Sequence, residues 1–169
     1  MIVTNSGPLI TLAKLGLLDN LARLYEKVIM PKAVYDEVVL KGFAKGYLDS
    51  LQVKLALQRQ SLAVMKVKIP NAEIEKLPLD KGEKEAIALA LQNKADLLLM
   101  DDMSAREQAK AFGLKVKGTL GIIVEAYRNE LLSIDEVRII FETIMKRNDI
   151  WIAEALCQNI LARLNKDTK

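Results

Sequence analysis

The stretch Leu97-Leu98-Leu99-Met100-Asp101-Asp102 decides the fold of this chain. Four consecutive apolar residues are typical of a strand that is buried on both faces, as strands of parallel sheets are. The two aspartates follow at its C-terminal end, which is where open α/β sheets form their ligand crevices. We therefore expect a parallel sheet with a polar site beside Asp101 and Asp102.

Short apolar runs that alternate with helical patterns lie on both sides of this stretch. They predict further strands at 1–4, 28–30, 63–69 and 114–116, with helices in the intervals between them. The clearest helix begins at Asp80, which together with Glu83 approximates a capping box. Strands that alternate with helices favour a parallel sheet covered by helices on both faces.

The length and patterning of the chain indicate a single domain over residues 1–169. Its α/β core is expected at about 1–128, followed by a helical extension at about 129–165. Asp149 is expected to cap the last helix of this extension, at 150–164.

The composition excludes several kinds of catalysis. The chain contains no histidine and only one cysteine, Cys157. Ser-His-Asp and Cys-His hydrolases, ribonucleases with a histidine acid–base pair and most catalytic zinc sites are therefore excluded. Chemistry must come from carboxylates, lysines, hydroxyls or hard cations bound by oxygen, such as Mg²⁺ or Mn²⁺. The net charge of +3 comes from scattered residues and does not by itself indicate nucleic-acid binding.

The N-terminal sequence shows no signal-peptide pattern, and no apolar run reaches the roughly 18 residues of a membrane span. A single cysteine cannot form an internal disulfide, and proteins without disulfides are typical of reducing compartments. We expect a cytoplasmic protein that has no membrane partner.

Side chains with oxygen ligands stand at the ends of the predicted elements. They are Asn5, Glu37, Glu83 or Glu85, and Asp101 with Asp102. Carboxylates brought together by a fold repel one another unless a cation neutralises them, so this set predicts a Mg²⁺ or Mn²⁺ site. Such an ion would orient and deprotonate a water molecule and stabilise charge on a phosphodiester oxygen.

Five motifs occur in an order that resembles the PIN-domain family, and more narrowly a poorly characterised prokaryotic subgroup of it. They are Val-Thr-Asn-Ser-x-Pro-Leu-Ile at 3–10, Pro-x-x-Val-x-x-Glu-Val at 31–38, Gly-Glu-x-Glu-Ala-Ile-x-Leu-Ala at 82–90, Ala-Asp-Leu-Leu-Leu-x-Asp-Asp at 95–102 and Gly-Thr-Leu-Gly at 118–121. No single motif is decisive, but their order is fairly specific. The match covers about residues 2–126.

The resemblance implies a three-layer α/β/α sandwich with a central, mainly parallel sheet and extra C-terminal helices. It also implies a Mg²⁺- or Mn²⁺-dependent ribonuclease that hydrolyses RNA phosphodiester bonds and forms a homodimer. Because the family includes toxins of toxin–antitoxin pairs, an antitoxin protein is a further expected partner.

Carried over motif by motif, the acidic positions of the family fall on Asn5, Glu37, Glu83 and Asp101, with Asp102 beside the last. The resemblance makes Glu37, Glu83 and Asp101 the catalytic residues. All five residues are then expected metal ligands.

Asn5 departs from the family pattern. An amide binds a cation through its carbonyl oxygen, but it carries no charge and cannot act as a base. Weaker metal binding than in a site of four carboxylates is therefore expected, and nuclease activity is in doubt. Ser6 and Thr119 are expected to support the site through their hydroxyl groups.

The glutamates at 83 and 85 compete for one role. They lie about 200° apart around a helix, so only one of them faces the crevice. Glu83 is favoured because it shares the buried helix face with Ile87 and Ala90, and Glu85 is the second choice.

Each of the main site residues also has a purely structural interpretation. Glu37 is suited to be a solvated glutamate on its helix, and Thr119 is suited to cap the helix that begins at Leu120. Asn5, Asp101 and Asp102 are each suited to cap the helix that follows. Glu83 is suited to be no more than the capping-box partner of Asp80.

Two functional hypotheses remain open. The first is a metal-dependent PIN-type ribonuclease, and the second is a catalytically weakened module that binds RNA or a protein because Asn5 replaces an acid. A phospho-receiver domain is disfavoured, because it needs its acidic pair after the first strand, where this chain has Asn5.

Overall fold

The computed structural model describes residues 1–67 and 71–167. The chain divides into two compact units, Met1–Thr119 and Leu120–Lys169. Among the described residues, no helix combines the length and the apolar character that crossing a membrane requires.

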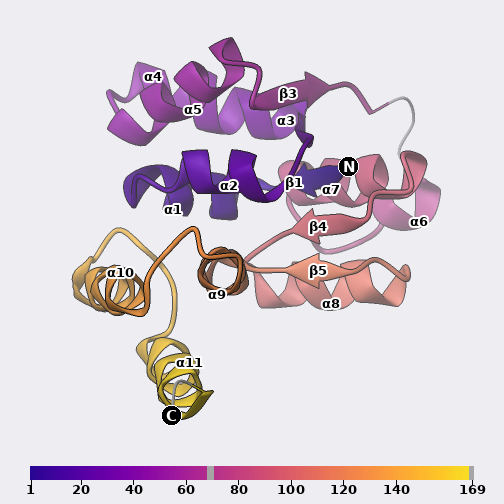
Figure 1. Ribbon diagram of the computed structural model, residues 1–169. Coiled ribbons are helices and arrows are strands. Elements are labelled where there is room, and N and C mark those ends of the chain that lie inside the picture. The colour runs from indigo at the N-terminus through magenta and orange to yellow at the C-terminus, as the bar shows by residue number, and fades with distance from the viewer. Residues whose placement is uncertain (68–70, 168–169) are drawn as a thin grey trace. The chain divides into compact units, whose positions relative to one another are not determined.

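The first unit is built on a five-stranded sheet in which every neighbouring pair is parallel, with the order β3-β2-β1-β4-β5 (Figure 1). The strands are β1 (Ile2–Thr4), β2 (Val28–Pro31), β3 (Leu62–Met65), β4 (Leu97–Leu99) and β5 (Val116–Lys117). Val3 on β1 is in register with Ile29 on β2 and with Leu98 on β4. The apolar stretch at 97–99 thus forms a strand beside the centre of the sheet, and its parallel pairing is confirmed.

Helices connect all the strands of this unit. They are α1 (Ser6–Lys14), α2 (Leu18–Leu24), α3 (Lys32–Tyr35), η1 (Asp36–Lys41), α4 (Gly42–Ala44), α5 (Leu48–Gln58), α6 (Ala72–Glu75), α7 (Lys81–Gln92) and α8 (Met103–Ala111). Right-handed crossovers place the helices after β1 and β2 on one face of the sheet and those after β3 and β4 on the other. The result is the predicted PIN-like α/β/α sandwich.

The hydrophobic core under α6, α7 and α8 shows which side chains hold one of these layers. Val3, Ile29, Leu98 and Met100 on the sheet side pack against a buried run of α7 at 86–90. Complete burial of each large aliphatic side chain contributes roughly 1.5–3 kcal/mol. This packing fixes α7, and with it the N-terminal end of the helix, against the sheet.

The strand order reverses between β1 and β4, which makes this pair of strands the topological switch point of the sheet. The backbone N–H of Asn5 donates to the carbonyl oxygen of Leu99 at 2.9 Å, so the carboxyl ends of the two strands stay together. Asn5 and Asp101 therefore leave the sheet at the same edge, as the sequence predicts for a ligand crevice.

Several element boundaries differ from the sequence predictions. The third strand begins one residue early and ends at Met65, and the predicted continuation to 69 reaches residues outside the described part of the chain. The last strand is β5 at Val116–Lys117 rather than 114–116. Its pairing is set by the backbone N–H groups of Leu98 and Met100, which donate to the carbonyl oxygens of Lys115 and Lys117. The segment Asp36–Lys41 is a π-helix, a conformation that apolar periodicity does not distinguish from an α-helix.

The second unit is helical and contains α9 from Leu120 on (the helix spans Thr119–Arg128), α10 (Ile134–Lys146) and α11 (Glu154–Asp167). Arg138 of α10 donates to Asn165 of α11 at 2.7 Å. The prediction that Asp149 caps a helix starting at residue 150 is wrong. Asp149 instead accepts two hydrogen bonds from Arg147, both at 2.8 Å, and α11 begins four residues later than predicted, at Glu154.

Candidate functional site

Asn5 occupies the turn between β1 and α1. Its backbone is extended, with φ −89° and ψ 176°, and it holds the N-cap position of α1. Its side chain makes no capping hydrogen bond, although the residue is only 5% exposed. Its Oδ1 atom has no hydrogen-bond partner among residues 1–67 and 71–167. Capping therefore does not explain this residue, and a buried acceptor without a partner costs roughly 1–3 kcal/mol.

The first turn of α7 approaches Asn5 closely at Gly82. A Cβ atom added to Gly82 would lie 3.5 Å from Asn5 Oδ1 and 3.4 Å from Asp80 Oδ1. It would also lie 3.4 Å from a methyl group of Val34. Because residue 82 is a glycine, the amide oxygen of Asn5 after β1 and the carboxylate of Asp80 before α7 both lie next to the position that a Cβ would take.

Glu37 reaches the same region from the π-helix η1. Burial raises the pKa of its carboxyl above the ordinary value of 4.5, and the negative charge of Asp80 raises it further. A hydrogen bond between the side chains of Glu37 and Ser6 acts in the opposite direction. Ser6 is itself buried, directly after Asn5. The predicted supporting hydroxyl therefore contacts one of the predicted carboxylates.

Glu83 and Asp80 form a complete capping box at the start of α7. Asp80 Oδ1 accepts from the Glu83 backbone N–H at 2.8 Å, and Glu83 Oε2 accepts from the Asp80 backbone N–H at 3.1 Å. Burial raises the pKa of Glu83, and the nearby charge of Asp80 adds to this effect. The charges of Asp102 and Glu37 raise this pKa as well. We call Glu37, Asp80, Glu83 and Asp102 the acidic cluster.

Asp101 uses both carboxylate oxygens to hold Thr119. Oδ1 accepts from the Thr119 backbone N–H and Oδ2 from its hydroxyl, each at 2.7 Å. Burial raises the pKa of Asp101, while these hydrogen bonds and the charge of Arg106 lower it. A Cβ on Gly118 would stand 2.9 Å from Asp101 Oδ1, so glycine is needed for the approach. Asp101 therefore anchors the turn between β5 and α9, and Thr119 is its partner.

Asp102 and Glu85 have separate structural roles. Asp102 caps α8, with Oδ1 accepting from the Ala105 backbone N–H at 2.8 Å. Glu85 Oε2 accepts from the Ala33 backbone N–H in the first turn of α3 at 2.9 Å. The Glu85 side chain is thus directed to α3, whereas Asp102 is near enough to Glu83 for its negative charge to raise the pKa of Glu83.

The structure brings together Asn5, Ser6, Glu37, Glu83 and Asp102 at one edge of the sheet. Asp80 also belongs there, and the sequence prediction treated it only as a helix cap. Its position as the N-cap of the helix that carries Glu83 was the signal that this residue also lies near the site.

The candidate site contains carboxylate and amide oxygens, the donor types that hard divalent cations prefer. Within the described part of the chain, no three Asp, Glu or Cys side chains lie close enough to hold a metal ion by themselves. Mg²⁺, however, is commonly bound by one or two carboxylates and keeps several waters. Asn5 Oδ1 adds a buried oxygen that has no other partner in that part of the chain. One or two members of the acidic cluster, Asn5 and water molecules would complete such a shell.

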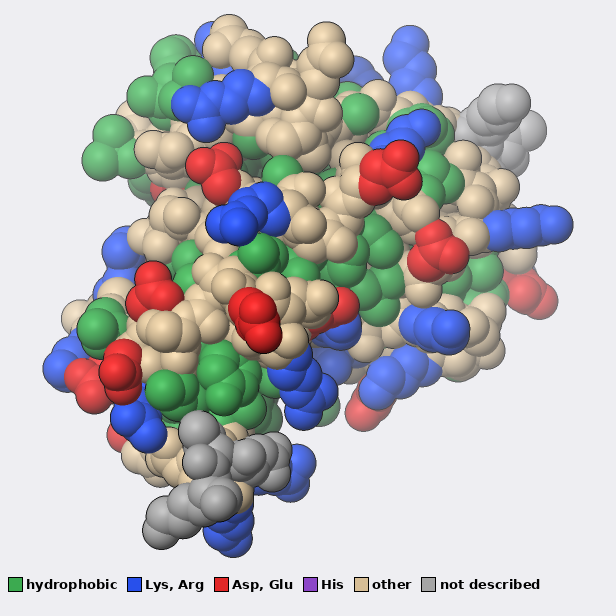
Figure 2. All heavy atoms as spheres, in the orientation of Figure 1, with side chains coloured by type: hydrophobic (Ala, Val, Ile, Leu, Met, Phe, Trp, Pro, Cys, Tyr) green, Lys and Arg blue, Asp and Glu red, His purple; other side chains and the backbone are tan. Residues whose placement is uncertain are grey.

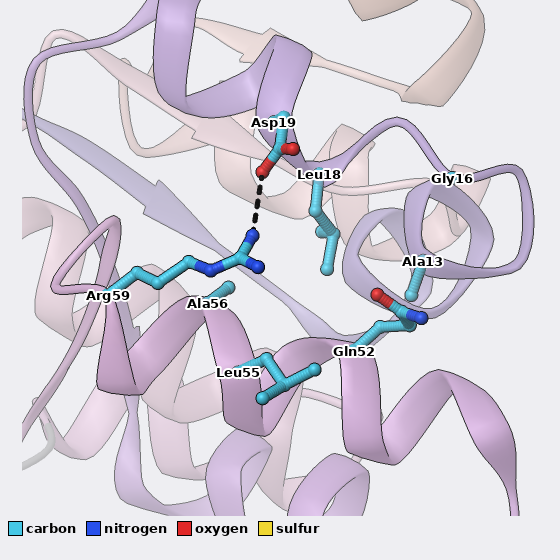
Figure 3. Close-up of a pocket in the computed structure, with 8 residues that line it drawn as sticks. All are labelled: Ala13, Gly16, Leu18, Asp19, Gln52, Leu55, Ala56 and Arg59. Carbon is cyan, nitrogen blue, oxygen red and sulfur yellow. Dashed lines mark ion pairs between the residues drawn. The ribbon is translucent and has the colours of Figure 1, made fainter.

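A hollow of about 50 Å³ lies elsewhere, between α1, α2 and α5 (Figure 3). Arg59 and Asp19 form an ion pair of 3.7 Å beside it, and Ala13, Leu55 and Ala56 are among the residues that line it. None of the predicted site residues contributes to its lining. We therefore place the candidate site at the edge of the sheet and not in this hollow.

The fold and the site together define a class of proteins with an α/β/α sandwich and acidic side chains at the carboxyl edge of a parallel sheet. A family model described as a PIN domain matches residues 1–166, and the chain belongs to the PIN-domain family. PIN domains are generally nucleases, which places the chain among nuclease-like proteins. No curated protein and no solved structure was found to match the chain.

Proposed function

We propose that this PIN-domain protein is a Mg²⁺- or Mn²⁺-dependent ribonuclease that hydrolyses phosphodiester bonds in RNA. The observation that carries the proposal is the buried, unpartnered Oδ1 of Asn5 beside the acidic cluster, as seen in the described residues. Family membership supports a hydrolase. Because the sequence has no histidine, proton transfer falls to the carboxylates.

Asn5 and one or two of Glu37, Glu83 and Asp102 are the residues that would hold the ion, with Asp101 adjoining. Asp101 contributes through lone pairs that Thr119 does not use, since a carboxylate has about four acceptor positions. When bound, the ion supplies an activated water and stabilises negative charge on the phosphodiester oxygens.

Glu37 and Glu83 are suited to proton transfer. Burial and neighbouring negative charges raise their pKa values. A carboxyl group whose pKa is closer to neutral pH is better suited to accept and then release a proton during catalysis. One of them accepts a proton from the attacking water as the water oxygen bonds to phosphorus. The bond from phosphorus to the leaving ribose oxygen then breaks, that oxygen takes up a proton from solvent water, and the carboxyl group releases its proton to solvent. Ser6 orients Glu37 through its hydrogen bond.

We extend the proposal to a toxin that binds an antitoxin protein and forms a homodimer. An exposed apolar patch on η1, α4 and α5 supports a protein partner. The patch consists of Leu40, Phe43, Tyr47, Leu48 and Leu51. Figure 2 shows hydrophobic side chains gathered over the region of α4 and α5 at the upper left. Contiguous exposed apolar surface marks interaction sites, so Leu48→Asp should shift the oligomeric state measured by light scattering toward the monomer.

Cleavage of a 5′-labelled single-stranded RNA tests the proposed activity. The native chain should cleave with Mn²⁺ and lose activity with EDTA, while Glu37→Gln and Glu83→Gln should each lower the rate about 100-fold or more. Glu107→Gln is the matched control, because Glu107 is an exposed carboxylate of α8 outside the site. Native-level cleavage by both site variants would refute the assignment of these carboxylates.

The alternative is a weakened module that binds RNA or a protein without cleaving RNA. The neutral side chain of Asn5 and the lack of three converging carboxylates in the described residues favour it. Cleavage that appears only in the Asn5→Asp variant would support this alternative. Equal cleavage by the native chain and the variant would exclude it.

A further inference from the structure

We infer that Asp80 supplies the carboxylate charge that the site lacks at Asn5, and that Asp80 and the Oδ1 atom of Asn5 bind the same divalent cation. This inference rests on the proposed metal-dependent function. It adds a residue that none of the five sequence motifs contains, because the third motif begins at Gly82.

The geometry at Gly82 brings these two groups together. Asn5 Oδ1 and Asp80 Oδ1 lie 3.5 Å and 3.4 Å from one point in space, the position that a Cβ on Gly82 would take. Asn5 comes from the end of β1 and Asp80 from the cap of α7, so the two oxygens converge from different elements.

The state of Asn5 independently indicates that a ligand belongs at this place. Its side chain is buried, and its Oδ1 accepts no hydrogen bond from any residue in the two described ranges. The Asp80 carboxylate near this amide oxygen offers it no donor, because an ionised carboxylate is only an acceptor. A cation would supply the partner that Asn5 Oδ1 lacks, and its charge would be balanced in part by Asp80.

Asp80 has coordination capacity beyond its capping role. Its Oδ1 accepts one hydrogen bond, from the Glu83 backbone N–H, and the residue is exposed. A carboxylate has about four acceptor positions, so capping leaves positions for an ion. Asp80 thus adds one negative charge near the neutral amide of Asn5.

The cap and the charge of Asp80 are separable by substitution. Asn and Ser cap helices about as well as Asp does, but neither carries a charge. Asp80→Asn and Asp80→Ser should therefore keep α7 intact while they remove one unit of negative charge from the proposed site.

Mn²⁺ binding, measured by isothermal titration on the full chain without RNA, tests the inference. Both Asp80 variants should bind Mn²⁺ about tenfold or more weakly than the native chain. Glu107→Gln should leave the affinity unchanged. The double variant Asn5→Asp/Asp80→Asn has the native charge and should return to within about threefold of native affinity.

The outcomes separate the inference from the function on which it rests. If the native chain binds no Mn²⁺ at millimolar concentration, both the metal-dependent function and the role of Asp80 fail. If the native chain binds Mn²⁺ and the Asp80 variants bind it equally well, the role of Asp80 alone is overturned. Rescue by Asn5→Asp identifies loss of charge as the cause, because that change cannot repair a helix cap. Weakened binding without rescue would show that Asp80 acts through α7 and would overturn the inference.

Discussion

The two hydrogen bonds between Asp101 and Thr119 lead to a prediction about stability. We expect Asp101→Ala to lower the free energy of unfolding by about 3 kcal/mol in EDTA, where no cation contributes. Each hydrogen bond to a charged group contributes roughly 1.5–3 kcal/mol, and Asp101 accepts two, both at 2.7 Å. We take the lower end of the total for the two hydrogen bonds, because burial of the Asp101 carboxylate opposes its ionisation, as the raised pKa of Asp101 indicates.

A double-mutant cycle isolates one of these bonds. Thr119→Val removes the hydroxyl bond to Oδ2 and keeps the backbone bond, so it should cost about 1.5 kcal/mol. In the Asp101→Ala background the same change should cost much less, which corresponds to a coupling free energy of about 1.5 kcal/mol. Thr119 and Asp101 lie within the same unit of the structure.

Urea unfolding followed by far-UV circular dichroism measures these differences. With a slope of about 2 kcal/mol per molar urea, a loss of 3 kcal/mol moves the midpoint by about 1.5 M. A coupling free energy below about 0.5 kcal/mol would refute the anchoring role of Asp101. The result also matters for the metal site, because weaker cation binding by Asp101→Ala would then reflect a loosened turn as well as a lost ligand. Asp101→Asn keeps the shape of the side chain and is the better variant for binding measurements.

Three further predictions concern other contacts of the first unit. A Cβ on Gly42 would lie 2.0 Å from the buried Ser50 Oγ, so Gly42→Ala should cost about 1–3 kcal/mol. Ser50→Ala should recover much of this loss in thermal unfolding, and equal midpoints for native chain and single variant would contradict the clash. Because the folded-state pKa of Glu37 is raised above 4.5, its contribution to stability is present below pH 4.5 and lost as pH rises through the folded value. Glu37→Gln should therefore gain stability relative to the native chain between pH 4 and pH 7 in EDTA, and a relative loss in urea midpoint would refute this sign. Glu85→Ala should cost about 1–2 kcal/mol because it leaves the Ala33 N–H without its acceptor, whereas Glu85→Gln, which keeps an acceptor, should cost less than about 1 kcal/mol.

The sequence predicted those parts of the fold that depend on local patterns. The apolar run at 97–100 identified β4, and the Asp80–Glu83 spacing identified the start of α7 because a capping box is a contact within four residues. The parallel sheet followed from the alternation of these elements.

Features that depend on distant contacts were beyond the sequence. The carboxylate of Glu85 and the N–H of Ala33 are 52 residues apart, and helical periodicity contains no information about such a pair. Asp80 was predicted as a cap, and only the approach of α7 to the end of β1 shows that it lies near Asn5. The third strand was predicted too long, since its exposed residues and its position at the edge of the sheet limit its pairing.

The hydrogen bond from Ala33 to Glu85 has a consequence for the kinetics of cation binding. α7 carries Asp80 and Glu83, while α3 runs directly into the π-helix that carries Glu37. These carboxylates repel one another, and without an ion the repulsion tends to separate the two helices. The Glu85 carboxylate connects the helices outside the site and opposes that separation. A site held together in this way is preorganised, so association with the ion requires little movement of the backbone and its rate should be set by the exchange of water on the ion.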